Sequence, residues 1–249
     1  ARDAALRQLG GGDDAVPVRL RDFTAVLEAA AKDDKISQAL LLLDEFKGAG
    51  LPTLREAAAA IARFRAAGKK VYAWGAGYDQ RQYFLAAQAD EIWLHPMGMV
   101  VFEGYGRYRT YYKDALDKLG VRANVVRAGK FKNAAETFAA NAPSPETLEA
   151  EGALYGSLWS SWTAAVEKAR KLPAGGVMRY LDGLPQTLPA AGGQPAKVAL
   201  AARLVDGLKT RDEMRALLVA RGARDDDKKS FRQVTLAGYL PHVEPRRGG

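Results

Sequence analysis

Two lysines stand close together where an apolar run gives way to small residues. They are Lys130 and Lys132, in the stretch RAGKFKNAAETF at 127–138. A lysine amine acts as a general base only when neutral, so its pKa must fall from about 10.4 by about three units, roughly 4 kcal/mol. Burial lowers the pKa of a lysine, and so does a second cation. Phe131 and Phe138 could exclude water around Lys132, and Lys130 could supply the repulsion.

A charged surface lysine is the competing interpretation of Lys132. Glu136 lies four residues further on, and in a helix its carboxylate could pair with the Lys132 ammonium and keep it charged. On residue chemistry alone, the catalytic and the surface interpretations both stay open.

Other catalytic chemistries find little support in the sequence. His95 and His242 are the only histidines, and neither has an acidic or histidine partner at ligand spacing. The two GAG stretches, at 48–50 and 75–77, extend to neither a dinucleotide fingerprint nor a Walker motif, so both are predicted to be turns. Cysteine is absent, which removes a thiol nucleophile. We therefore expect no metal and no bound cofactor.

The serines offer no evident nucleophile. None of them lies on a Gly-rich turn between a strand and a helix, and Ser144, before Pro145, is better placed to cap a helix. The six serines are at 37, 144, 157, 160, 161 and 230. If Lys132 is a base, its serine is not evident in this chain.

Short apolar runs alternate with helical patterns along the chain. The runs typical of buried parallel strands lie at 39–43, 71–74, 90–96, 99–102 and 122–129, with one further strand predicted within 228–240. Helices with one apolar face are predicted at 23–31 and 111–119, and further helices at 81–88, 174–182, 194–204 and 210–221.

Two more helices are predicted from their end signals. Thr53 is the predicted N-cap of a helix that ends at Gly68, and Ser144 that of a helix running to about Arg170. Strands that alternate with helices indicate an α/β fold, with a mostly parallel sheet and helices packed on its faces.

Composition is that of a globular protein with a sizeable core. The 249 residues are 48% hydrophobic and 27% charged, with a formal net charge of +8. No nucleic-acid motif accompanies the basic balance. No apolar run of about 18 residues is present, which leaves open a membrane anchor outside this chain.

The stretch RAGKFKNAAETF resembles the lysine segment of the long, two-repeat signal peptide peptidase A family of bacteria, whose pattern runs approximately R-x-G-x-[YF]-K-[SN]-A-x-E-x-F. The chain fits this pattern at Arg127, Gly129, Phe131, Lys132, Ala134, Glu136 and Phe138. The similar stretches elsewhere are GKKVYAWGAGYDQRQYFLAAQADEIWLHPMG, YYKDALDKLGV, NAPSPETLEAEG and AKVALAARLVDGL. The resemblance covers about 23–240, in order.

The resemblance implies a ClpP/crotonase-like fold of stacked ββα units, and a chain that is the N-terminal half of a two-domain enzyme. It divides the chain into an N-terminal extension (1–22), the first repeat (23–240) and a tail leading to a missing C-terminal catalytic repeat (241–249). In this family the first repeat supplies a lysine general base, here Lys132, and the second supplies the serine nucleophile.

One departure from the serine-bearing repeat fits this division. The stretch DQRQYF at 79–84 stands where that repeat has its serine loop, so that Gln80 takes the serine position and Gln82 replaces a glycine. The resemblance therefore implies that this repeat lacks its own nucleophile, and that the isolated chain is inactive.

The family's activity would be Ser-Lys proteolysis of cleaved, apolar signal peptides, without metal or nucleotide. The resemblance further implies a homo-oligomer, tetrameric in the long form, anchored through a missing N-terminal span on the periplasmic side of the bacterial inner membrane. Two alternatives are a non-catalytic assembly module and a crotonase-like acyl-CoA enzyme. The latter usually needs catalytic acids, of which the loop at 75–82 offers only Asp79.

Overall fold

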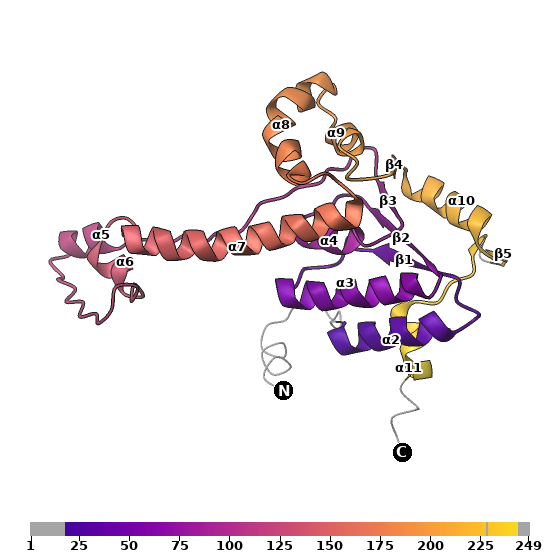
Figure 1. The fold of residues 1–249 in the computed structure, drawn as a ribbon, viewed down its shortest axis with the longest axis horizontal. Coiled ribbons are helices and arrows are strands. Elements are labelled where there is room, and N and C mark those ends of the chain that lie inside the picture. The colour runs from indigo at the N-terminus through magenta and orange to yellow at the C-terminus, as the bar shows by residue number, and fades with distance from the viewer. Residues whose placement is uncertain (1–17, 228, 244–249) are drawn as a thin grey trace, which may run out of the picture.

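The computed structural model describes residues 18–227 and 229–243. Its centre is a four-stranded sheet in the order β1 (Gln38–Leu42), β2 (Lys70–Gly75), β3 (Glu91–Leu94) and β4 (Gly207–Leu208), with every neighbouring pair parallel. The α/β class with a parallel sheet is confirmed (Figure 1).

Helices cover both faces of this sheet. Helices α2 (Leu20–Lys32) and α3 (Leu51–Ala66) lie together on one side, and α10 (Arg211–Arg221) lies on the other (Figure 1). The face of α3 towards the sheet is apolar and buried, at Leu54, Ala57, Ala58, Ile61 and Phe64. A smaller second core on the α10 side consists of Tyr72, Trp74, Met214 and Leu218.

The start of α3 differs from the prediction. The helix begins at Leu51, with Gly50 as the N-cap and Pro52 in its first turn, so Thr53 is not the cap. Proline fits the first turn of a helix because the N–H that it lacks would have no partner there and because its φ is already helical. The helix therefore starts closer to the N-terminus than the sequence predicts. The predicted end is correct, since Gly68 follows the C-cap with φ +84°.

The remaining core elements follow the predicted order. Helix α4 (Gln80–Ala86) follows β2. Helices α8 (Gly176–Ala190) and α9 (Pro195–Ala201) follow the helix α7 (Pro145–Arg170). The predicted strand at 99–102 is reduced to a single bridge between Val100 and Tyr78. After α10 come the short strands β5 (Arg224–Asp225) and β6 (Ser230–Phe231) and then α11 (Leu236–Val243), which packs on α2.

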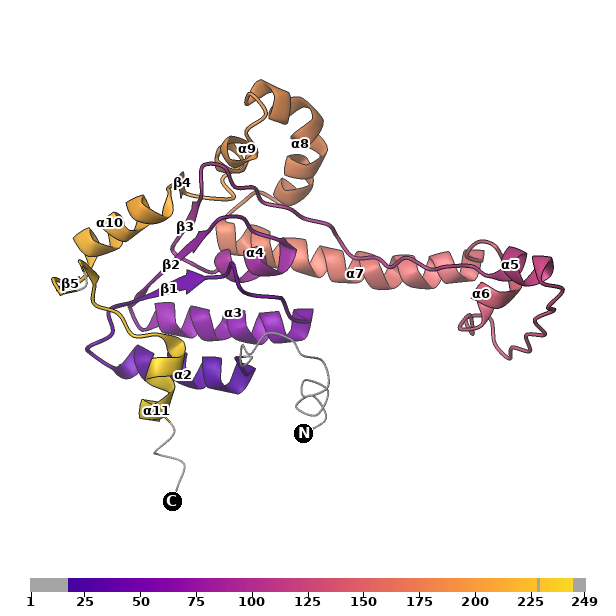
Figure 2. The same cartoon turned by 180° about the vertical axis from the view of Figure 1, so that it is seen from behind.

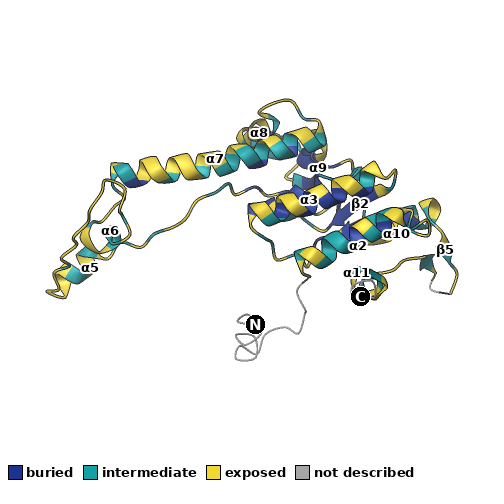
Figure 3. Cartoon of the chain, turned by 60° about the horizontal axis from the view of Figure 1, so that its bottom comes forward, coloured by how far each residue is buried: buried dark blue, intermediate teal, exposed yellow. Residues whose placement is uncertain are grey.

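An arm projects from this α/β core. The chain leaves the core after Phe102, forms the short helices α5 (Lys113–Lys118) and α6 (Glu136–Ala139), and returns through the 26-residue helix α7 (Pro145–Arg170). Figures 1 and 2 both place α5 and α6 at the outer end of α7, away from the sheet. Figure 3 shows that the buried residues concentrate in the core and become sparse along the arm.

The predicted strand at 122–129 is wrong. These residues form neither helix nor strand and lie between α5 and α6 at the outer end of the arm, where the described residues offer no sheet edge to pair with (Figures 1 and 2). An extended segment needs such an edge for its backbone groups, and without one water has to satisfy them.

The predicted domain boundaries stay a prediction. The helix α2 begins at Leu20 and α11 runs to Val243, so both proposed boundaries, at 22/23 and 240/241, fall within helices. Most of the predicted extension (1–17) and the end of the predicted tail (244–249) lie outside the described residues.

Candidate active-site lysine

Lys132 lies in the turn just before α6, at the outer end of the arm (Figure 1). Its backbone N–H donates to the carbonyl of Gly129 at 3.3 Å, and Gly129 has a φ of +106°, which favours glycine. The side chain of Lys132 is exposed. Among the described residues, its ammonium makes no hydrogen bond or ion pair.

The predicted shielding of Lys132 by two phenylalanines is wrong for this chain. Phe131 is 48% exposed and Phe138 is 47% exposed. The ring of Phe131 lies under the Lys130 ammonium at 5.0 Å, and Phe138 stacks on Tyr112 with ring centroids 5.6 Å apart. Both rings are engaged with other partners because the arm has no apolar core to draw them over Lys132.

Lys130 is held by a surface ion pair. Its ammonium lies 3.6 Å from a carboxylate oxygen of Glu149, and both side chains are mostly exposed. Exposed pairs of this kind contribute at most about 1 kcal/mol.

Glu136 does not pair with Lys132. Its Oε1 accepts hydrogen bonds from the Ser144 N–H at 2.9 Å and the Tyr111 hydroxyl at 3.3 Å. Its Oε2 accepts from the hydroxyls of Ser144 at 2.6 Å and Thr147 at 2.8 Å. The alternative in which Glu136 keeps Lys132 charged is therefore wrong for this structure.

The carboxyl of Glu136 stays ionised in this environment. Burial would raise its pKa, but the hydrogen bonds from Ser144 and Thr147 favour the charged form more strongly and lower the pKa to about 2. The carboxylate of Glu136, a residue of α6, is thus a fixed negative charge beside the first turn of α7, where the helix N-terminus also favours it.

Thr147 connects this carboxylate to the residue next to the lysine. Its hydroxyl accepts a hydrogen bond from the Asn133 side-chain amide at 2.7 Å while it donates to Glu136. We call Tyr111, Asn133, Glu136, Ser144 and Thr147 the polar cluster. The sequence correctly predicts Ser144 as the N-cap of α7, since its hydroxyl also accepts from the Thr147 N–H. No local pattern predicts the contacts of Asn133 and Glu136, which form across 8 to 25 residues.

The glutamines at the expected serine loop are used structurally. Gln80 is buried, accepts from the N–H groups of Glu103 and Gly104 at 3.1 and 2.7 Å, and donates to the Gly104 carbonyl at 3.1 Å. Gln82 closes a capping box with Asp79 and also donates to the Leu43 carbonyl at 2.9 Å. The loop therefore fixes the point where the arm leaves the core, and it presents no nucleophile.

The histidines also have local roles. The His95 ring nitrogen accepts from the Met97 N–H at 3.2 Å, and the His242 ring stacks on Tyr239 at 5.7 Å. Within 18–227 and 229–243, no group of three or more His, Asp or Glu side chains could hold a metal ion.

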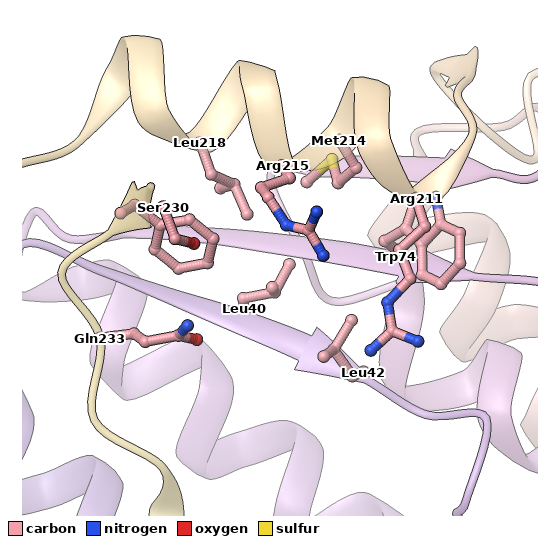
Figure 4. Close-up of a pocket in the computed structure, with 10 residues that line it drawn as sticks. Leu40, Leu42, Trp74, Arg211, Met214, Arg215, Leu218, Ser230 and Gln233 are labelled. Atoms are coloured by element: carbon pink, nitrogen blue, oxygen red, sulfur yellow. The ribbon is translucent and has the colours of Figure 1, made fainter. Parts of the chain in front are cut away.

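A shallow pocket lies far from the lysine, on the α10 side of the sheet (Figures 1 and 4). Leu40, Leu42 and Trp74 form its floor, and Arg211 and Arg215 of α10 border it. It contributes no group to the surroundings of Lys132.

Among the helices in the described ranges, none is both long enough and apolar enough to cross a membrane.

The structure defines an α/β domain with an exposed lysine on a projecting arm and with hydrogen-bonded glutamines, Gln80 and Gln82, in α4. Residues 63–222 match peptidase family S49. The chain belongs to this peptidase family, as its resemblance to signal peptide peptidase A implies.

Relatives with protease names agree with this assignment. The chain is 32% identical to "Protease 4" of Salmonella typhi over 230 residues, and 32% identical to "Protease 4" of Haemophilus influenzae over 244 residues. These alignments cover 92% and 97% of this chain but only 37% and 39% of the relatives. "Serine protease SPPA, chloroplastic" of Arabidopsis thaliana is 22% identical over 200 residues, 80% of this chain and 28% of that protein. The chain thus spans less than two fifths of each.

Proposed function

We propose that this chain is the lysine-donating part of a Ser-Lys endopeptidase whose serine lies in another domain. The neutral amine of Lys132 takes the proton of the serine hydroxyl as the serine oxygen attacks a peptide carbonyl carbon. The peptide C–N bond breaks, the leaving amine receives the proton, and an acyl-enzyme remains. Water, deprotonated by the same amine, then releases the acyl group and restores the serine.

One observation carries this proposal: the Lys132 amine is exposed at the end of the arm while the acidic side chains around it have other partners. Glu136 is held in the polar cluster, and Glu149 lies beside Lys130. A lysine base that serves a nucleophile in another domain needs an amine that the other domain can contact and that is not paired with a carboxylate of its own chain.

The arm also offers the surface on which a second domain would bind. Its exposed large apolar side chains are Tyr108, Tyr112, Leu119, Val121, Val125, Val126, Phe131, Phe138, Leu148 and Leu154. Apolar surface of this extent on a protein usually marks an interface. A serine-bearing C-terminal domain, or a second copy in a homo-oligomer such as a tetramer, would cover the arm and supply the desolvation that a lysine base requires.

The substrate class is an extension of the same proposal. The resemblance to signal peptide peptidase A supports cleaved, apolar signal peptides as substrates, with the enzyme anchored on the periplasmic side of the bacterial inner membrane. Backbone N–H groups of the serine-bearing domain would hold the oxyanion. The reaction needs neither metal nor nucleotide.

The test replaces Lys132 by Ala in the full-length protein and measures hydrolysis of a chromogenic peptide ester. Loss of a general base is expected to lower kcat/KM by about 10²–10⁴-fold while the thermal transition stays unchanged. Lys118→Ala is the control, because Lys118 is an exposed lysine of the same arm. Full activity of Lys132→Ala would overturn the assignment.

A non-catalytic assembly module remains the second candidate, because the apolar surface of the arm would serve assembly equally well. It predicts that Lys132→Ala changes nothing while substitutions on the arm surface abolish association. An acyl-CoA enzyme has less support, because the one acid of the loop, Asp79, accepts from the N–H groups of Arg81 and Gln82. Thermal stabilisation by an acyl-CoA would favour that third function.

A further inference from the structure

The buried side chains of the arm are polar. Between 103 and 156, only Glu136 and Thr147 are buried, at 8% and 0% exposure. Buried charges are costly unless paired or fully hydrogen-bonded, and a projecting arm has no apolar core to hold them in place. The buried carboxylate lies where the lysine segment contacts the first turn of α7, and its position there needs a physical reason.

We propose that Glu136 is a positioning residue for Lys132: its carboxylate fastens the lysine segment to the first turn of α7 and is itself kept away from the lysine amine. The catalytic consequence rests on the function proposed above, whereas the fastening of the segment does not.

The four acceptor positions of the carboxylate are all occupied. Each oxygen receives two hydrogen bonds, from the Ser144 N–H and the Tyr111 hydroxyl on one side and the Ser144 and Thr147 hydroxyls on the other. An ionised carboxylate offers about four such positions. Glu136 therefore has no acceptor left for the Lys132 ammonium, although the two residues are only four positions apart.

The same hydrogen bonds reach the lysine through its neighbour. Asn133 directly follows Lys132, and its side-chain amide donates to the Thr147 hydroxyl that binds Glu136. A backbone hydrogen bond of 2.7 Å from Tyr112 N–H to the Thr137 carbonyl ties the approach to α5 to the same unit. The backbone on the C-terminal side of Lys132 is thus tied to α7 by hydrogen bonds, and the half-exposed Phe138 ring stacks on Tyr112 beside them.

The sharpest variant is Glu136→Gln. An amide keeps the shape but has one acceptor oxygen, and its NH₂ group would face the donors that the carboxylate oxygens now accept. Glu149→Gln is the matched control, because it removes an exposed carboxylate of the same arm.

The structural test is hydrogen exchange on this 249-residue chain, read at 132–136 and at the amides of Ser144 and Thr147. Glu136→Gln is expected to speed exchange there by about tenfold or more, with β2 and α3 unchanged, and Glu149→Gln to leave both regions as they are. If Glu136→Gln does not fold, Thr147→Val removes the link to Asn133 while keeping the carboxylate. Unchanged exchange at 132–136 in the variant that folds would overturn the proposal.

The catalytic test uses the full-length protein and peptide ester hydrolysis across pH. Glu136→Gln is expected to lower kcat by about 10- to 100-fold with little change in KM, and to shift the acid limb of the pH profile. Glu136→Asp, which keeps the charge, should recover part of the activity. If Lys132→Ala retains activity, the proposed function fails and only the exchange result stands. If Lys132→Ala is inactive while Glu136→Gln has the normal kcat and pH profile, the positioning role fails.

Discussion

The two ends of α7 are built in opposite ways. At the C-terminal end, Trp162 and Val166 are fully buried among aromatic and aliphatic side chains, and the Trp162 ring contacts those of Phe102 and Trp159. At the N-terminal end, the buried side chain is the hydroxyl-bearing Thr147. The C-terminal end of α7 is therefore held by apolar side chains of this chain that pack against it, whereas the N-terminal end is held mainly by hydrogen bonds.

The charged side chains at the two ends of α7 also have different kinds of partner. Near the core, the Arg170 guanidinium makes two hydrogen bonds to Asp206 at 3.0 and 2.8 Å, and Asp206 also accepts from the Ile92 N–H at 2.7 Å. These bonds tie α7 to the sheet. At the outer end, the carboxylate of Glu136 binds neutral donors, and Lys132 stays free of it. Under the proposed function, the core would be the stable platform from which the arm presents the Lys132 amine to another domain.

The largest expected effect comes from truncating the buried end of α7. Trp162→Ala would leave a cavity in the core and should lower the free energy of unfolding by about 3–5 kcal/mol, measured by denaturant titration. Leu154→Ala, two turns earlier on the same helix and 55% exposed, should change it by less than about 0.5 kcal/mol. Equal losses would contradict the division of α7 into two regions.

A smaller effect is expected where the arm leaves the core. Gln80→Ala would leave the N–H groups of Glu103 and Gly104 without their partner and should cost about 1–3 kcal/mol. Gln80→Ser should cost a similar amount and should not create peptidase activity in this chain. Hydrolysis of a peptide ester by Gln80→Ser alone would mean that this domain can complete a dyad by itself.

The smallest effect is local and depends on pH. The pKa of Glu136 is about 2 in the folded arm, below the ordinary glutamate value of about 4.5, so its contribution to stability is fully present above pH 4.5 and is lost as the pH falls towards 2. The groups around it are Tyr111, Ser144, Thr147 and the nearby Arg109–Glu151 ion pair. Between pH 4.5 and 2.5, the protection of the amides at 132–147 against hydrogen exchange, relative to the intrinsic exchange rate at each pH, should fall more than that of β2. Glu136→Gln should show no such extra loss of protection.

The sequence predicts those parts of the structure that local signals determine. Ser144 before Pro145 marks the start of α7, Gly68 marks the end of α3, and short apolar runs mark β1, β2 and β3. The strand predicted at 122–129 is wrong because apolar residues do not form a strand without a neighbouring edge. The sequence does not reveal that this segment lies on an arm.

The candidate site follows the same pattern. The position of Lys132 in a turn before a small-residue helix is predicted, and its role comes from the family resemblance. Its shielding by Phe131 and Phe138 is wrong, because both rings have other partners. Glu136 is misassigned because the donors it binds lie across a chain reversal that spacing alone does not show.

The most direct measurement of the central claim mixes this chain with a separately made serine-bearing domain and follows hydrolysis of a chromogenic peptide ester. We predict activity only in the mixture, and none when this chain carries Lys132→Ala. Activity of the mixture that survives Lys132→Ala, or activity of this chain alone, would contradict the claim that this domain donates the base to a serine elsewhere.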